Sequence, residues 1–229
     1  MANSINTNVG AQVALQNLNQ TSRELAMTQN RVNTGQKVSS AKDNGAIWAT
    51  AQNQKANMQV LNTTRNTLQR TQSVNDVGLA AGDTIMDALR QMKELAAGPA
   101  STARDADLAA LRTEVVAAQA AAVFDGTAAL SGLTLTIAAA PTAGQIDADI
   151  ASAISALQTL GTSSKSTERS LAFNDKLQDA LEAGIGNLVD ADLAKESARL
   201  TALQTKQQLG VQALSIANQS SSILLGLFR

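Results

Sequence analysis

The sequence predicts a mainly α protein: a long antiparallel helical bundle or coiled coil with a small β-hairpin, in which the N- and C-terminal helices pair. Three observations support this fold class. Aromatic residues make up only 2% of the 229 residues, while Ala, Leu, Gln, Ser and Thr dominate, a composition typical of long, closely packed helices. Apolar residues recur every seven positions at both ends of the chain. One short stretch alternates apolar and polar residues as a β-strand does.

The C-terminal stretch 188–229 carries the strongest seven-residue pattern, which in a helix forms two neighbouring rows. The rows are Leu193, Leu200, Gln207, Leu214, Ser221 and Phe228, and then Leu203, Gly210, Ala217 and Leu224. Other apolar residues, among them Ile216, project from other faces, and no charged residue lies between Lys206 and Arg229. The interspersed Gln, Ser and Asn residues leave no apolar run of about 18 residues, which a membrane span requires. We therefore expect this helix to be buried among protein neighbours on several faces.

Residues 4–33 predict an amphipathic helix, because Ala11, Leu18, Leu25 and Val32 are spaced by seven. Toward its free end this helix is nearly uncharged, as the C-terminal helix is. We expect the two termini to pair with each other and then with copies of themselves. Since an isolated helix is marginal in water, both ends are expected to order on assembly.

Three more helices are predicted between the termini, over about 46–97, 103–122 and 147–185. Gly98 and Pro99 end the first of them, and Ser101 or Thr102 caps the second. The third has a weak point at the GTSSKST stretch that begins at Gly161.

The region 127–140 has the strand signal, because Leu133, Leu135 and Ile137 alternate with threonines. With Gly132 as a turn residue, this pattern predicts a small β-hairpin near 127–140.

The composition excludes several classes of function. The chain has no Cys and no His, which removes thiolate chemistry, imidazole acid–base catalysis and the usual zinc ligands. A net charge of -1 and a pI near 5.5 provide no basic surface for nucleic acid. Residues 1–22 contain no Lys or Arg and no apolar core of a signal peptide. We expect no catalysis, no cofactor and no metal, and any export by a route other than a conventional secretory signal.

Two local features, a group of carboxylates and a tryptophan, each have a structural and a functional interpretation. Asp190, Asp192 and Glu196 could form a carboxylate site, but acidic residues at a helix N-terminus are the favoured interpretation. Trp48 could serve as a ligand platform, but its place on an apolar stripe favours a filler of a core or an interface.

Several stretches in order along the chain resemble bacterial flagellin, the subunit of the flagellar filament. They are SINTNVGAQVALQNLNQTSRELAMTQNRVNTGQKVSSAKDNGA from Ser4, MKELAA from Met92, the FDG turn at Phe124, and NLVDADLAKESARLTALQTKQQLGVQALSIANQ with a closing LF from Asn187. The resemblance covers nearly the whole chain except about 127–165. One departure is Ala46-Ile47-Trp48, where the family more often has smaller aliphatic residues.

The resemblance implies a division into two domains. Residues 1–44 and 188–229 would form the paired helices of the inner filament core, and 45–187 a helical rod domain with the hairpin. The larger outer domains of other flagellins would be absent. The residues assigned to filament-core assembly are Leu18, Leu25, Val32, Leu193, Leu200, Leu203, Leu214, Ile216, Leu224 and Phe228.

The resemblance also implies partners and a location. The subunit would be exported, would polymerise with itself outside the cell, and would meet a flagellin secretion chaperone, the filament cap and the hook-associated proteins. It would not insert into a membrane. The alternatives are a hook–filament junction protein, which shares the terminal helices, and an adaptor or signalling coiled coil of chemoreceptor type. The absence of a membrane-spanning segment and of charged positions flanking the seam argues against the adaptor, and an enzyme ranks last.

The family resemblance further implies a patch for the vertebrate immune receptor that detects flagellin, at a sequence like QRVRELA. The matching stretch here begins at Arg90 and has Gln91 and Lys93 where the family has arginines, whereas Glu94 and Leu95 match, as does Glu114 further on. An amide or an ammonium cannot replace the planar five-donor guanidinium. We therefore expect weakened recognition.

Overall fold

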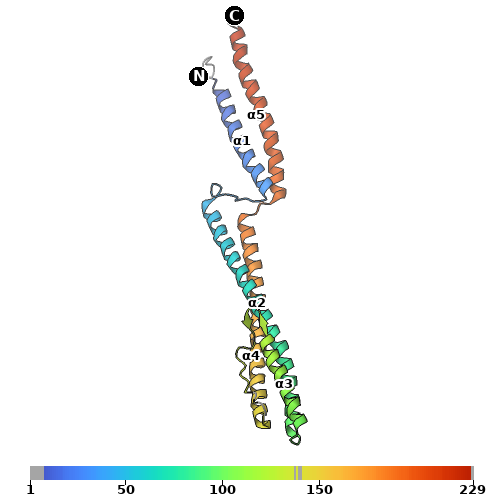
Figure 1. Ribbon diagram of the computed structural model, residues 1–229. Helices are drawn as coiled ribbons and strands as arrows, with labels where there is room; N and C mark the ends of the chain where they lie inside the picture. The colour runs from blue at the N-terminus through green and yellow to red at the C-terminus, as the bar shows by residue number, and fades with distance from the viewer. Residues whose placement is uncertain (1–7, 137, 139–140, 228–229) are drawn as a thin grey trace. The chain divides into compact units, whose positions relative to one another are not determined.

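The computed structural model describes residues 8–136, 138 and 141–227, with side chains as far as residue 219. Its elements are α1 (Val9–Thr34), α2 (Gly45–Ala97), α3 (Thr102–Ala121), β1 (Val123–Phe124), β2 (Thr127–Ala128), α4 (Ala143–Val189) and α5 (Leu193–Leu227) (Figure 1). Contacts divide the chain into two units, residues 1–57 with 181–229 (the terminal unit) and residues 58–180 (the central unit). The mainly helical fold with a small antiparallel hairpin is confirmed.

The ends of α1 and the start of α3 follow local capping chemistry. The Asn8 side chain accepts a hydrogen bond from the N–H of Ala11 at 3.0 Å at the start of α1, and residues 4–7 of the predicted helix lie outside the described residues. α1 ends at Thr34, and its C-cap residue Gly35 has a left-handed φ of 69°. α3 has the predicted cap, since the Ser101 hydroxyl accepts a hydrogen bond from the N–H of Arg104 at 3.2 Å.

The helix α4 is longer than predicted, and the expected weak point at Gly161 is not a break. Side chains of α2 reach the polar stretch that follows it. Asn75 Nδ2 donates to Ser163 Oγ at 3.2 Å, and Gln72 Nε2 donates to Ser164 Oγ at 2.8 Å. These partners satisfy hydroxyls that would otherwise favour a turn.

The hairpin lies earlier than the predicted position near 127–140. β1 and β2 pair antiparallel across Asp125 and Gly126, which both have positive φ, as a tight two-residue hairpin loop requires. The stretch that follows β2 is not a strand, although its apolar residues Leu130 and Leu133 are buried. The prediction of a strand there is wrong, and Ile137 lies outside the described residues.

Helix side chains take the place of a partner strand in this stretch. Gln119 Nε2 of α3 donates to the Leu133 carbonyl at 2.8 Å, and the N–H of Thr136 donates to the Asp149 carboxylate of α4 at 2.7 Å. Alternating apolar residues can therefore pack inward without forming a sheet.

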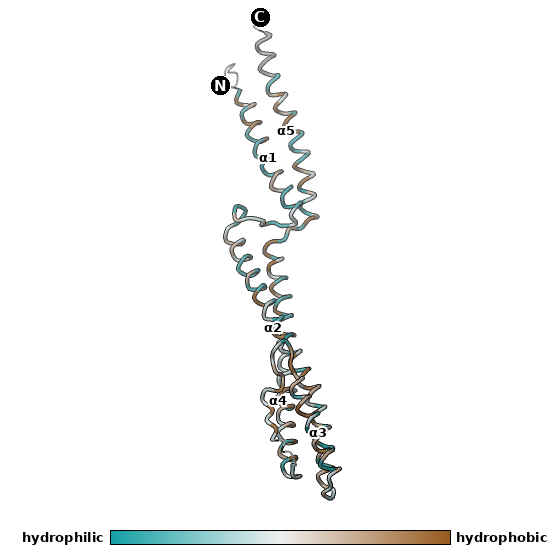
Figure 2. The backbone as a smooth tube through the Cα atoms, viewed as in Figure 1, coloured by the Kyte–Doolittle hydropathy of each residue, from teal (hydrophilic) through white to brown (hydrophobic). Residues whose placement is uncertain are grey.

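The core of the central unit lies where α2, α3 and α4 run side by side, and apolar residues gather there in Figure 2. Its most buried large side chains are Ile85, Leu89, Met92, Leu108, Val115 and Ile146. α2 and α4 approach closely at Gly78 and Gly82, since a Cβ at Gly78 would lie 3.0 Å from Leu160 Cδ1 and one at Gly82 would collide with Leu157. The core has few aromatic residues, and aliphatic side chains, some of them packed directly against the glycines of α2, fill it instead.

Candidate functional site

The terminal unit is built around a seam between α1 and α5, which lie side by side (Figure 1). Buried and half-buried residues alternate at spacings of three and four in both helices, as in a coiled coil. They are Ala11, Ala14, Leu18, Thr21, Leu25, Thr28 and Val32 in α1, and Glu196, Leu200, Leu203, Gln207, Gly210, Leu214 and Ala217 in α5. The predicted pairing of the terminal helices is confirmed.

Small and polar residues occupy the centre of this seam, which sequence reasoning missed. Thr21 and Thr28 are 3% and 2% exposed, less than any leucine of the seam. The Thr21 hydroxyl donates to the Asn17 carbonyl at 2.9 Å, so its burial leaves no donor unsatisfied. Gly210 brings the α5 backbone close to α1, because a Cβ there would lie 3.3 Å from Leu18 Cδ1. The seven-residue row that runs from Ala14 through positions 21 and 28 would have identified Thr21 and Thr28 as seam residues.

The residues predicted for filament-core assembly fall into three groups. Inside the seam the structure brings together Leu18, Leu25, Val32, Leu200, Leu203 and Leu214. Leu193 and Ile216 lie outside it, 49% and 68% exposed. The side chains of Leu224 and Phe228 lie outside the described residues. The role of all ten in assembly stays a prediction.

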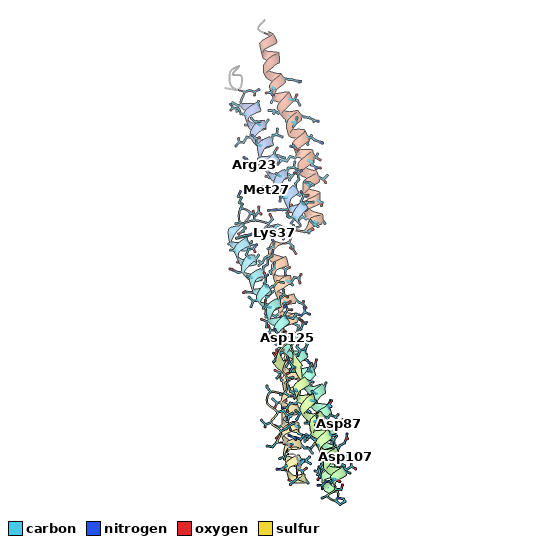
Figure 3. The ribbon with its side chains drawn as sticks, in the orientation of Figure 1. Arg23, Met27, Lys37, Asp87, Asp107 and Asp125 are labelled. Carbon is cyan, nitrogen blue, oxygen red and sulfur yellow. The ribbon has the colours of Figure 1, made fainter. Side chains whose placement is uncertain are left out.

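Large apolar side chains also remain in solvent on both terminal helices. Val13 and Met27 of α1 are 50% and 51% exposed, and Leu209 and Val211 of α5 are 58% and 53% exposed; Met27 is labelled in Figure 3. Val13, Leu209 and Ala213 border a groove that follows the seam. Such a concentration of exposed apolar residues marks a surface that binds another protein.

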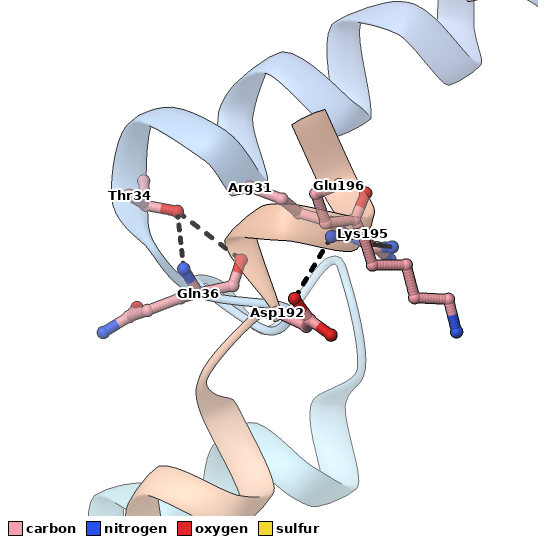
Figure 4. Close-up of polar contacts among 6 residues, drawn as sticks. All are labelled: Arg31, Thr34, Gln36, Asp192, Lys195 and Glu196. Carbon is pink, nitrogen blue, oxygen red and sulfur yellow. Dashed lines mark hydrogen bonds and ion pairs between the residues drawn. The ribbon is translucent and has the colours of Figure 1, made fainter. Parts of the chain in front are cut away.

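The end of the seam is held by polar contacts, shown in Figure 4. Arg31 forms an ion pair with Glu196 at 3.2 Å. Asp192 caps α5 by accepting hydrogen bonds from the N–H groups of Ala194 and Lys195 at 3.0 and 3.1 Å. The capping and the ion pair support the structural interpretation of the carboxylate cluster, and no group of three metal ligands occurs among the described residues.

The chain connects α1 to α2 through a segment that pairs with the end of α4. The N–H of Lys37 donates to the Val189 carbonyl at 2.6 Å, and the N–H of Ala191 donates to the Gly35 carbonyl at 2.9 Å. These bonds lie at the junction where α4 ends at Val189 and α5 begins at Leu193.

Further along this connector, Asp43 fixes a tight turn. The N–H and hydroxyl groups of Ser39 and Ser40 all donate to one Asp43 oxygen, at 2.9 to 3.1 Å. The bond from the Ser40 backbone, followed by that from the Ser39 hydroxyl, lowers the pKa of Asp43 below its usual 3.8. Trp48, at the start of α2, is half-buried, which fits a packing role better than an open platform.

The residues predicted to meet the immune receptor lie on α2 and α3 of the central unit. Gln91, Glu94 and Glu114 are exposed. Lys93 is exposed too, but its ammonium pairs with Asp147 at 2.6 Å. Leu95 is half-buried and packs against the core. Four of the five side chains are therefore accessible in the subunit, and their recognition by a receptor stays a prediction.

None of the helices, over the residues that the structure describes, is long and apolar enough to span a membrane.

Comparison with known proteins assigns the architecture to a family. Residues 5–134 match the bacterial flagellin N-terminal helical region, and residues 143–228 match the bacterial flagellin C-terminal helical region. Flagellin FljM of Caulobacter vibrioides is 50% identical over 270 aligned residues, which cover 99% of each chain. A flagellin of Brucella melitensis is 32% identical over 288 residues and Flagellin C of Rhizobium meliloti 28% over 318, with the same 99% coverage on both sides.

These matches favour a filament subunit over a junction protein or a signalling adaptor, and they place the chain in a family of structural proteins. The two matched regions leave only residues 135–142 between them. The chain belongs to the bacterial flagellin family and is a structural subunit that polymerises into the flagellar filament, the organelle of swimming motility.

Proposed function

We propose that the paired terminal helices, residues 1–44 and 188–229, form the inner core of the filament, and that residues 45–187 form the surrounding rod. The observation that carries this proposal is the exposure of apolar side chains of α1 and α5 outside the seam, Ile216 above all at 68%. Burying a side chain of this size contributes about 2 kcal/mol. Copies of the same helix pair are the neighbours that a self-assembling subunit provides.

The subunit acts by assembly and not by catalysis, in keeping with the absence of His and Cys. We infer that the subunit is exported before it assembles, since the filament of this family lies outside the cell. Before assembly, the apolar surface of α5 needs a protective partner, and a flagellin secretion chaperone meets this need. In the filament, the cap and the hook-associated proteins are the expected neighbours at the two ends.

A single substitution tests the role of the terminal unit. In Ile216→Asp, the side chain is already exposed in the subunit, so the free energy of unfolding of the subunit should change little. If assembly buries this position, an unpaired carboxylate there costs several kcal/mol per contact. Sedimentation and electron microscopy after salt-induced assembly should show filaments for the wild type and few or none for Ile216→Asp.

Ser215→Asp is the matched control, because Ser215 is also exposed on α5 and the change introduces the same charge one position away without replacing an apolar side chain. Normal filaments from Ile216→Asp would contradict the placement of α5 in the core of the filament. Discrete particles from the wild type would contradict self-assembly itself.

A further inference from the structure

One side of α4 in the central unit carries three cations around an exposed aromatic ring. Lys165, Arg169 and Lys176 are spaced by four and seven residues, which places them along one side of the helix, and Phe173 lies among them. All four side chains are exposed, Phe173 to 67%. None of the three cations forms an ion pair with another described residue. We call these four residues the basic knob.

The rim of the knob is apolar. Phe173 and Arg169 border a groove between α4 and α2 that Leu61, Leu68 and Leu177 line. The apolar core cluster of the central unit lies further along, from Val74 on α2 and up to Leu160 on α4. The knob therefore lies outside that cluster, and a partner could cover its ring and aliphatic neighbours.

A second groove of the central unit has a net negative charge. The residues that line it include Asp83, Asp87 and Arg90 of α2 and Ile154 of α4, and Ile154 is 51% exposed. Asp87 pairs with Arg90 at 3.1 Å and is labelled in Figure 3, whereas Asp83 forms no ion pair with any described residue. We call Asp83, Asp87 and Ile154 the acidic groove.

The knob and the groove of one subunit cannot meet each other. Gln72 of α2 contacts Ser164 of α4, and from this pair Asp83 and Arg169 lie in opposite directions along the two antiparallel helices. At 1.5 Å per residue, the two charges are about 24 Å apart along the bundle. If a second copy is displaced along the bundle by this distance, its knob lies level with the groove of the first copy.

We propose that the basic knob of one subunit docks into the acidic groove of a second copy of the chain, with Arg169 facing Asp83 and Phe173 covering Ile154. This proposal rests on the proposed function of the chain as a filament subunit. Two different surfaces of one chain that complement each other make a head-to-tail contact, which repeats without closing and generates a helical polymer. The charges provide the register of the contact, and Phe173 and Ile154 provide its apolar area.

Charge reversal on full-length subunits tests the pairing. Arg169→Glu and Asp83→Arg should each raise the critical concentration for seeded assembly at low salt about tenfold, because close charge pairs at interfaces commonly contribute about 1.5 kcal/mol or more. The double variant carries both reversed charges and should assemble near the wild-type concentration. An equimolar mixture of the two single variants should also assemble, since each contact between unlike copies pairs opposite charges.

The controls are Arg112→Glu and Asp107→Arg, which reverse exposed charges on α3 and should leave the critical concentration unchanged. Thermal unfolding followed by circular dichroism checks that each subunit is folded. Wild-type assembly by Arg169→Glu, or loss of assembly without recovery in the double variant and the mixture, would overturn the pairing while the filament function stands. A wild type that forms no filaments would overturn both.

Discussion

The close approach of α2 and α4 makes a sharp prediction for two glycines. Gly82 lies in α2 against α4, where an added Cβ would collide with Leu157 Cδ2 and lie 3.0 Å from its Cγ. Gly161 lies inside α4, where an added Cβ would meet no atom within 4 Å. Alanine therefore adds the same methyl group to a crowded and to an open helix position.

The two substitutions should change stability in opposite directions. Alanine inside a helix is favoured over glycine by about 0.5–1 kcal/mol, so Gly161→Ala should raise the free energy of unfolding by about that amount. Overpacking a close contact costs about 1–3 kcal/mol, which exceeds the helix gain. Gly82→Ala should therefore lower the free energy of unfolding by about 1 kcal/mol, because the branched end of Leu157 must move.

Urea denaturation of the unassembled subunit, followed by circular dichroism, measures both changes. The two variants should shift the unfolding midpoint in opposite directions without a change in the slope. Equal stabilisation by both would refute the argument, since it would show that the Leu157 side chain moves aside at no cost.

Three further predictions concern the termini, the connector and the receptor patch. Brief proteolysis of the unassembled subunit should remove residues 1–40 and 190–229 and leave a helical fragment near 45–187, because the terminal helices gain most of their burial on assembly; ends that resist the protease would contradict this. The lowered pKa of Asp43 means that its bonds to Ser39 and Ser40 persist above its ordinary 3.8 and are lost as pH falls through the lower folded value. An NMR titration of the two serine amides should therefore show a midpoint below 3.8 that is absent from Asp43→Asn, and a midpoint at or above 3.8 would disprove the assignment. Gln91→Arg should increase potency in a reporter-cell titration of the immune receptor, because a guanidinium fork at an interface centre commonly adds about 2 kcal/mol, roughly thirtyfold in affinity; equal potency would show that this position does not set recognition.

The sequence determined the helical architecture because its signals are local or strictly periodic. The seven-residue spacing of Leu18, Leu25 and Val32 specifies a helix face without reference to any neighbour, and the matching rows after residue 193 specify its partner. Likewise Ser101 caps α3 through a bond to a residue three positions away.

Tertiary structure decided the features whose local signal is ambiguous. The alternation at Leu133 and Leu135 is equally compatible with a strand and with an irregular segment that buries every second side chain. Gln119 and Asp149, which lie outside this segment, form hydrogen bonds with its backbone and so favour the irregular segment. In the polar stretch after Gly161, which stays helical, α2 amides donate to the hydroxyls of Ser163 and Ser164, and the hydroxyls of Thr162 and Thr167 donate to carbonyls of α4 itself.

The division of apolar residues between the seam and the surface also required the structure. Leu203 and Ile216 both belong to an apolar pattern of α5, yet the first is 6% and the second 68% exposed. A helix that carries apolar residues on several faces does not reveal from its sequence which face its own chain covers, because that choice depends on the register with α1. The buried face pairs α5 with α1, and the exposed one is left for neighbouring subunits.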